Sequence, residues 1–152
     1  MIKLSLIGAA LIAATIWIHA VGCVYWMRYL IANQTDAEGN WRGNRALAIL
    51  LSSAIVLVGL HVVEIFVWAI AYRQLVPEQL PTFEQAAYFS FVTYTTLGYG
   101  DITLTDSWRL LSGFEAINGI LLAGWTTAIL FAIVQRVWAQ RRDRLLNRSD
   151  TQ

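Results

Sequence analysis

Residues 95–101 read TTLGYGD and place two threonines, two glycines and an aspartate within a strongly apolar half of the chain. The two glycines would destabilise a helix by about 1 kcal/mol each, and a buried aspartate without a partner would cost more. An extended backbone aims all its carbonyl oxygens to one side only when left- and right-handed angles alternate, and glycine adopts the left-handed angles without a Cβ penalty. Gly98 and Gly100 therefore predict a row of neutral oxygens along residues 96–100, to which the Thr96 hydroxyl adds one more. Such a row can replace the water around a dehydrated cation.

A single chain supplies only one row of oxygens, and one row cannot surround an ion. Its polar backbone would also face lipid without hydrogen-bond partners, which membrane proteins avoid. The stretch therefore predicts that several copies of this chain assemble around a common axis.

A second set of polar side chains lies inside the apolar runs. His61 and Glu64 are three residues apart and share one helix face. We expect His19 at a depth similar to His61, and Glu115 near the level of Glu64. Ionisable groups inside a membrane are costly and mark functional sites. Two interpretations stay open: a titratable cluster that couples pH to ion flow, and a structural network that anchors the neighbouring helix, which we favour.

The composition indicates the elements that must position these residues. Of 152 residues, 57% are hydrophobic and 14% are charged, against about 45–50% and about 25% in soluble domains. Three nearly uncharged runs, residues 4–27, 46–72 and 110–135, each exceed the roughly 20 residues that cross a bilayer as a helix. The sequence thus predicts an all-α membrane protein with three transmembrane helices. Its single cysteine, Cys23, excludes an intrachain disulfide.

The first apolar run has an alternative interpretation as a signal peptide. Lys3 precedes it, and residues 20–23 (AVGC) resemble a lipoprotein cleavage site. The run is longer than the usual signal core of about 7–15 residues and carries several aromatic side chains. We therefore expect it to be kept as a transmembrane helix.

The basic residues predict the orientation of the chain. Five arginines near the C-terminus favour a cytoplasmic tail, so three crossings leave the N-terminus outside. Residues 33–45 then form a cytoplasmic loop, and residues 73–109 lie outside. The tail arginines either bind anionic lipid headgroups, at about 1 kcal/mol each, or only fix this topology. No helix carries arginines at every third position, so a voltage sensor of the usual kind is not expected.

The outer segment is too long and too apolar for a simple loop. Pro77 and Pro81 begin it, and Thr82 is a suitable cap for a helix over residues 83–95. At 1.5 Å per residue this helix reaches only about halfway into the bilayer. Such a re-entrant helix is tolerated only where the backbone after it is buried in protein or lines a watery path.

The motif TTLGYGD, after a short helix and before a long one, resembles the signature of tetrameric potassium channels, whose filter loops read TVGYG. The resemblance covers about residues 65–135, and Leu97 in place of valine is the only departure within the filter. It implies a homotetrameric pore of the bacterial two-transmembrane type, in the bacterial inner membrane, with an extra N-terminal helix. It implies passive K+ conduction, with the ion held by the carbonyls of residues 96–100 and no cofactor besides this permeant ion. The filter residues are Thr96, Leu97, Gly98, Tyr99 and Gly100.

With this resemblance, the chain divides into four parts. Residues 1–32 form the extra helix, residues 33–45 the cytoplasmic loop, residues 46–138 the pore domain and residues 139–152 a basic cytoplasmic tail. Within the pore domain we expect the outer helix over 46–72, the pore helix over 83–95, the filter over 96–100 and the inner helix over 109–137.

The resemblance also suggests roles for residues of the inner helix, which should line a cavity below the filter. Gly119, or second Gly124, is placed where a gating hinge can lie, although both glycines can equally serve close helix packing. Asn118 either offers its amide to hydrated ions in the cavity or forms an interhelical hydrogen bond.

One departure from the family concerns the support of the filter. Some relatives carry a glutamate on the pore helix that pairs with the aspartate after the filter, and Val92 stands there in this chain. Tyr88, where many relatives have a tryptophan, can donate its hydroxyl to Asp101 instead. We predict a Tyr88–Asp101 hydrogen bond of about 3.2 Å or less and assign filter support to these two residues and Thr95.

Other function classes find no support in the sequence. Metal-ligand spacings, nucleotide-binding loops and nucleophile–base pairs are missing, so neither an enzyme nor a nucleic-acid-binding protein is expected. Two alternatives to a K+ channel stay open: a non-conducting or regulatory membrane protein that retains the pore fold, and a weakly selective cation channel.

Overall fold

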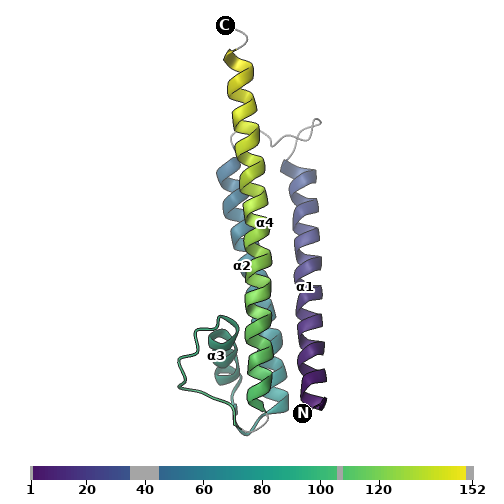
Figure 1. Ribbon diagram of the computed structural model, residues 1–152, viewed down its shortest axis with the longest axis vertical. Coiled ribbons are helices and arrows are strands. Elements are labelled where there is room, and N and C mark those ends of the chain that lie inside the picture. The colour runs from purple at the N-terminus through teal and green to yellow at the C-terminus, as the bar shows by residue number, and fades with distance from the viewer. Residues whose placement is uncertain (1, 35–44, 106–107, 150–152) are drawn as a thin grey trace.

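The computed structural model describes residues 2–34, 45–105 and 108–149, which form four helices and no strand (Figure 1). These are α1 (Ile2–Gln34), α2 (Ala46–Leu75), α3 (Phe83–Tyr94) and α4 (Arg109–Ser149). Three stretches, Ile2–Asn33, Ala46–Leu75 and Arg109–Ala139, are long and apolar enough to cross a membrane. The predicted class, an all-α protein with three membrane-spanning helices and one short helix, is confirmed.

The three long helices stand side by side, and α2 runs opposite to α1 and α4 (Figure 1). The short helix α3 and the loop that follows it lie at the end where α1 and α4 begin. The N-terminus and the 96–100 segment are therefore at the same end of the molecule, and the C-terminus is at the other. This is the relative arrangement expected from the basic residues.

The helix α1 packs closely against both long neighbours. A Cβ added at Gly8 would come within 2.6 Å of the Phe114 ring on α4, and one at Gly22 would come within 2.5 Å of Leu60 on α2. The Trp26 indole donates a hydrogen bond of 3.0 Å to the Ser53 hydroxyl of α2. Small residues and polar side chains at helix contacts are the usual means of packing in lipid. They make α1 an integrated part of the bundle.

Two apolar clusters hold the bundle at its two ends. The larger one joins α2, α3 and α4 with the segments on either side of α3, and includes Trp68, Tyr72, Leu80, Phe89 and Leu111. The smaller one joins α1, α2 and α4 near the other end through Leu30, Ile49, Ile133 and Val137. The larger cluster fixes the position of α3 and of the backbone that leaves it.

The three long helices extend beyond their predicted bounds, whereas α3 ends at Tyr94, one residue before its predicted end. The extra helix reaches Gln34 rather than residue 32, the outer helix reaches Leu75 rather than 72, and α4 continues to Ser149 rather than ending at 137. The predicted tail over residues 139–152 is thus helical as far as it is described. Its sequence to residue 149 contains arginine, leucine and glutamine but no glycine or proline, so nothing interrupts the helix.

Candidate functional site

The short helix α3 begins and ends with defined contacts. The Thr82 hydroxyl accepts from the Gln85 amide at 3.1 Å, and the Gln85 side chain accepts from the Thr82 amide at 3.3 Å, which makes the predicted cap a full capping box. At the other end, the Val92 carbonyl accepts from the amides of Leu97 at 3.0 Å and Gly98 at 3.2 Å. The start of the 96–100 segment is therefore tied to the last turn of α3.

The backbone of residues 96–100 alternates in hand. Gly98 has φ +56° and Gly100 has φ +79°, as their glycine identity predicted. Thr96 has φ +58°, which the sequence analysis did not predict. A left-handed backbone costs a β-branched residue about 1–2 kcal/mol, so a threonine gives no sequence signal for it. Every second residue is thus left-handed, which is the condition for successive carbonyls to point to one side.

The 96–100 segment is uncovered in the single chain. Leu97 is 55% exposed and Tyr99 is 67% exposed, although both are large and largely apolar. Among the described residues, and apart from the adjacent residues in the chain, no heavy atom lies within 4 Å of the Cβ positions of Gly98 and Gly100. A cavity of about 700 Å³ adjoins the segment and is lined in part by Val92, Thr96 and Ser112. One chain therefore leaves both faces of this backbone open.

The predicted contact between Tyr88 and Asp101 is present. The Tyr88 hydroxyl donates to Asp101 Oδ2 at 2.7 Å. This hydrogen bond holds the pKa of Asp101 below its ordinary value and raises the pKa of Tyr88. The Thr95 hydroxyl, by contrast, donates to the Phe91 carbonyl at 2.6 Å and so closes the end of α3. That these contacts support a filter stays a prediction.

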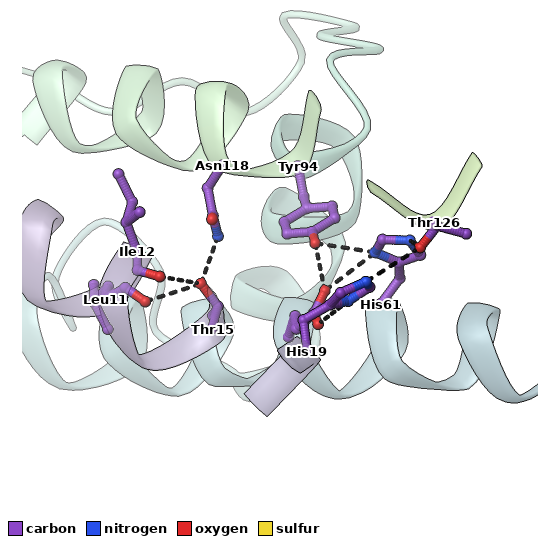
Figure 2. A network of polar contacts seen from close by, with 9 residues as sticks. Leu11, Ile12, Thr15, His19, His61, Tyr94, Asn118 and Thr126 are labelled. Atoms are coloured by element: carbon purple, nitrogen blue, oxygen red, sulfur yellow. Dashed lines mark hydrogen bonds and ion pairs between the residues drawn. The ribbon is translucent and has the colours of Figure 1, made fainter. Parts of the chain in front are cut away.

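A buried polar cluster joins all four helices behind this segment (Figure 2). The Glu64 carboxylate lies 2.8 Å from His19 Nδ1, 3.1 Å from His61 Nδ1 and 2.6 Å from the Tyr94 hydroxyl. The Thr126 hydroxyl lies 2.9 Å from His61 Nε2 and 3.4 Å from His19 Nε2. The proximity expected among the two histidines and Glu64 is confirmed. Coupling of this cluster to pH stays a hypothesis.

Two members of this cluster, Tyr94 and Thr126, were missed by the sequence analysis. Each is a hydroxyl-bearing residue in an apolar helix, but such residues also face lipid or bond their own helix backbone. Only the way the four helices pack brings their hydroxyls to His61 and Glu64.

A depth of Glu115 near that of Glu64 stays a prediction, but the structure does not bring Glu115 into the cluster of His19, His61 and Glu64. Glu115 is fully buried, and among the described residues neither carboxylate oxygen has a hydrogen-bond partner. The groups that influence it are the hydroxyls of Tyr72 on α2 and Ser90 on α3. These neighbours place it at a separate polar site beside α3.

The cavity-facing interpretation of Asn118 is wrong. Its side chain is fully buried, and its amide donates to the Thr15 hydroxyl of α1 at 2.7 Å (Figure 2). Thr15 in turn donates to the Leu11 carbonyl at 3.0 Å. Asn118 therefore forms the interhelical hydrogen bond that was the open alternative.

The two glycines of α4 differ in their surroundings. A Cβ on Gly119 would overlap the Tyr94 carbonyl oxygen, so α4 and the end of α3 meet backbone to backbone. This contact supports the packing interpretation of Gly119. At Gly124, by contrast, no described atom beyond the adjacent residues and the nearby backbone of α4 lies within 4 Å of the Cβ position. A hinge at Gly124 stays a prediction.

These features are typical of one class of membrane protein. In it, two long helices, here α2 and α4, flank a short helix that reaches only part of the way into the bilayer, followed by a backbone segment in which left- and right-handed residues alternate. A family model described as "Ion channel" matches residues 58–136, from within α2 to within α4. The chain belongs to this ion channel family, as its resemblance over about residues 65–135 predicted. The family is one of channels and not a class of enzymes. No curated protein and no solved structure matches the chain.

Proposed function

We propose that the protein is a potassium-selective channel whose filter is the backbone of residues 96–100. The observation that carries this proposal is the left-handed backbone at Thr96, Gly98 and Gly100 within the sequence TLGYG of an ion channel. A row of neutral carbonyl oxygens replaces the hydration shell of a K+ ion without binding it so tightly that conduction stops. Leu97 takes part through its backbone carbonyl alone, so its departure from valine does not change the row.

We infer a homotetramer, because four rows are needed to enclose the ion. The exposed side chains of Leu97 and Tyr99 support this inference, since a neighbouring chain can cover them. The helix α4 also leaves large apolar side chains uncovered by its own chain: Ile117, Ile120, Leu121 and Phe131. In the tetramer these face the axis or a neighbour. The helix α1 lies on the flank away from α3 and takes the periphery (Figure 1).

The proposed orientation puts the N-terminus and the filter outside and the C-terminus in the cytoplasm. The arginines of the C-terminal part support this orientation through the positive-inside rule. They also offer contacts to anionic lipids of a bacterial inner membrane.

The first test is ion flux into liposomes that contain only this protein. Wild-type protein should admit K+ and Rb+ and be blocked by Ba2+. Gly98→Ala should abolish flux, because nothing crowds a Cβ there and only the φ of +56° opposes the side chain. Gly59→Ala is the matched control, since Gly59 lies in α2 with an equally open Cβ position and no left-handed angle.

Two results would contradict the proposal. Absence of K+ flux from folded tetramers would favour a non-conducting protein that retains the pore fold. Equal entry of Na+ and K+ would favour a weakly selective cation channel.

A further inference from the structure

We propose that His19, His61 and Glu64 form a binding site for a transition-metal dication such as Zn2+, which fastens α1 to the pore-forming helices. One ligand atom from each of the three residues can be chosen so that all lie within 4.8 Å of one another. Two imidazoles and one carboxylate form a usual ligand set for zinc with one position left for a further ligand. None of the three ligands belongs to the row of residues 96–100.

The buried position of the site favours a specific role over chance proximity. His19 and Glu64 are fully buried, and His61 is 17% exposed. Ionisable side chains are rare inside membrane-spanning helices because their desolvation is costly. Here three ionisable side chains from two helices, α1 and α2, meet at one place. His19 and His61 are the only two histidines in the sequence.

The hydrogen-bond inventory of the cluster matches a bound metal. A carboxylate only accepts, so His19 donates to Glu64 through Nδ1–H when no metal is bound. His61 does the same when the Tyr94 hydroxyl, which lies 3.1 Å from His61 Nδ1, donates to Glu64. Each Nε2 then faces the same Thr126 hydroxyl, at 3.4 Å and 2.9 Å. If both imidazoles are neutral, the single hydroxyl proton satisfies only one of the two Nε2 atoms. The other is left without a partner unless it gains a proton.

A dication removes this conflict. When it replaces the two Nδ1 protons, each Nε2 carries a hydrogen, and Thr126 offers two lone pairs to accept them. A metal-bound histidine almost always donates its second ring N–H to an oxygen in this way. Thr126 is thus placed as the common outer partner of both ligands.

The site has a route of entry and a connection to the filter. His61 and Tyr94 line a cavity of about 420 Å³ that also reaches Thr96 and Gly119. The Tyr94 hydroxyl lies 2.6 Å from Glu64 Oε2 and offers a further oxygen at the metal. Tyr94 is the last residue of α3, two positions before the left-handed Thr96. A metal on Glu64 would therefore restrain the inner end of the filter.

The test measures metal binding to the purified full chain without a polyhistidine tag. After treatment with chelator, equilibrium dialysis against Zn2+ and elemental analysis should find one ion per chain. X-ray absorption should show two imidazole nitrogens and carboxylate oxygen at about 2.0–2.2 Å and no sulfur. Because the measurement is made in detergent, its result does not depend on whether the channel conducts K+.

Variants assign the binding to this cluster. His19→Gln and Glu64→Gln should lose stoichiometric Zn2+ binding. Thr126→Val, which keeps all three ligands, should weaken it about 10- to 100-fold. Two controls should bind as wild type: Cys23→Ser, which removes the only thiol, and Glu115→Gln, which changes a buried carboxylate outside the cluster.

Three outcomes would overturn the proposal. The first is a wild-type protein that binds no Zn2+ at one equivalent. The second is sulfur in the coordination shell, which would point to Cys23. The third is unchanged binding by a folded His19→Gln variant. The first two need only wild-type protein, so they decide the matter even where a ligand variant does not fold.

Discussion

At the residue scale, the Tyr88–Asp101 hydrogen bond lies at the outer end of the proposed filter. Relatives with a glutamate on the pore helix have a carboxyl pair there, whereas this chain has Val92 and relies on Tyr88. The hydroxyl of Tyr88 lies 2.7 Å from Asp101, and both residues are accessible in the single chain. The contact therefore acts through geometry and orientation rather than through burial of a charge.

Tyr88→Phe removes this hydrogen bond while it keeps the ring. We expect the variant to lose current faster than wild type when external K+ is low, because Asp101 no longer fixes the outer end of the filter. Patch recordings from liposomes at high and low K+ measure this loss. A phenylalanine variant with wild-type decay would show that Asp101 is held by other groups.

Acid should break the Tyr88–Asp101 contact by protonating Asp101, and this protonation should need a lower pH than the protonation of an aspartate without a partner. The hydrogen bond from Tyr88 lowers the pKa of Asp101 below its ordinary 3.8. A carboxyl group whose pKa is lowered in the folded protein stabilises the structure at pH values above its ordinary pKa. This stabilisation is lost as the pH falls through the lowered pKa. Filter stability in low K+ should therefore hold at pH 5 and decline only below about pH 4.

Tyr88→Phe provides the control for this pH dependence. Without the hydroxyl, the pKa of Asp101 returns toward its ordinary value, so the acid-induced decline that this group causes should become smaller or disappear. Identical acid profiles of the variant and the wild type would exclude Asp101 as the titrating group.

At the element scale, the contact of α3 with α4 fixes the position of the 96–100 segment, the proposed filter. Gly119 lets the Tyr94 carbonyl approach the α4 backbone, while the hydroxyl of the same tyrosine bonds Glu64 of α2. The C-terminal end of α3 is thus fixed from two sides. Close approach at a glycine and a polar bond replace the apolar attraction that is missing between helices in lipid.

Gly119→Ala should destabilise the folded protein by about 1–3 kcal/mol, because the added methyl group meets backbone that cannot turn away. Gly124→Ala, with open space at the Cβ position, should be no less stable than wild type. Thermal unfolding of the two variants in detergent makes the comparison. Equal midpoints would mean that α3 and α4 do not meet as closely as described.

Much of this architecture could be predicted, because apolar run length determines membrane helices and a capping box marks the start of α3. Gly98 and Gly100 could be predicted because glycine is the residue that takes left-handed angles freely. The left-handed angle at Thr96 could not be predicted, because a threonine does not favour it and it arises from how the backbone leaves α3. The partner of Asn118 and the neighbours of Glu115 could not be predicted. The rotation of a helix about its axis depends on packing, and hydrophobic periodicity does not fix that rotation in helices that are apolar on all sides.

At the scale of the whole molecule, the single chain leaves part of its surface uncovered on one side of the bundle. The faces around residues 96–100 and along α4 are exposed, whereas the faces toward α1 and α2 are packed. We therefore expect the purified protein to have the mass of four chains by native mass spectrometry, with α1 at the periphery. A folded monomer or a dimer without fourfold relation would contradict the proposed pore.

The most direct test of a potassium-selective filter is the reversal potential of purified protein in a planar bilayer with K+ on one side and Na+ on the other. If the backbone of residues 96–100 selects K+, the current should reverse close to the potential set by K+ alone, far from zero. A reversal potential at zero would mean that Na+ passes as readily as K+ and would contradict the account.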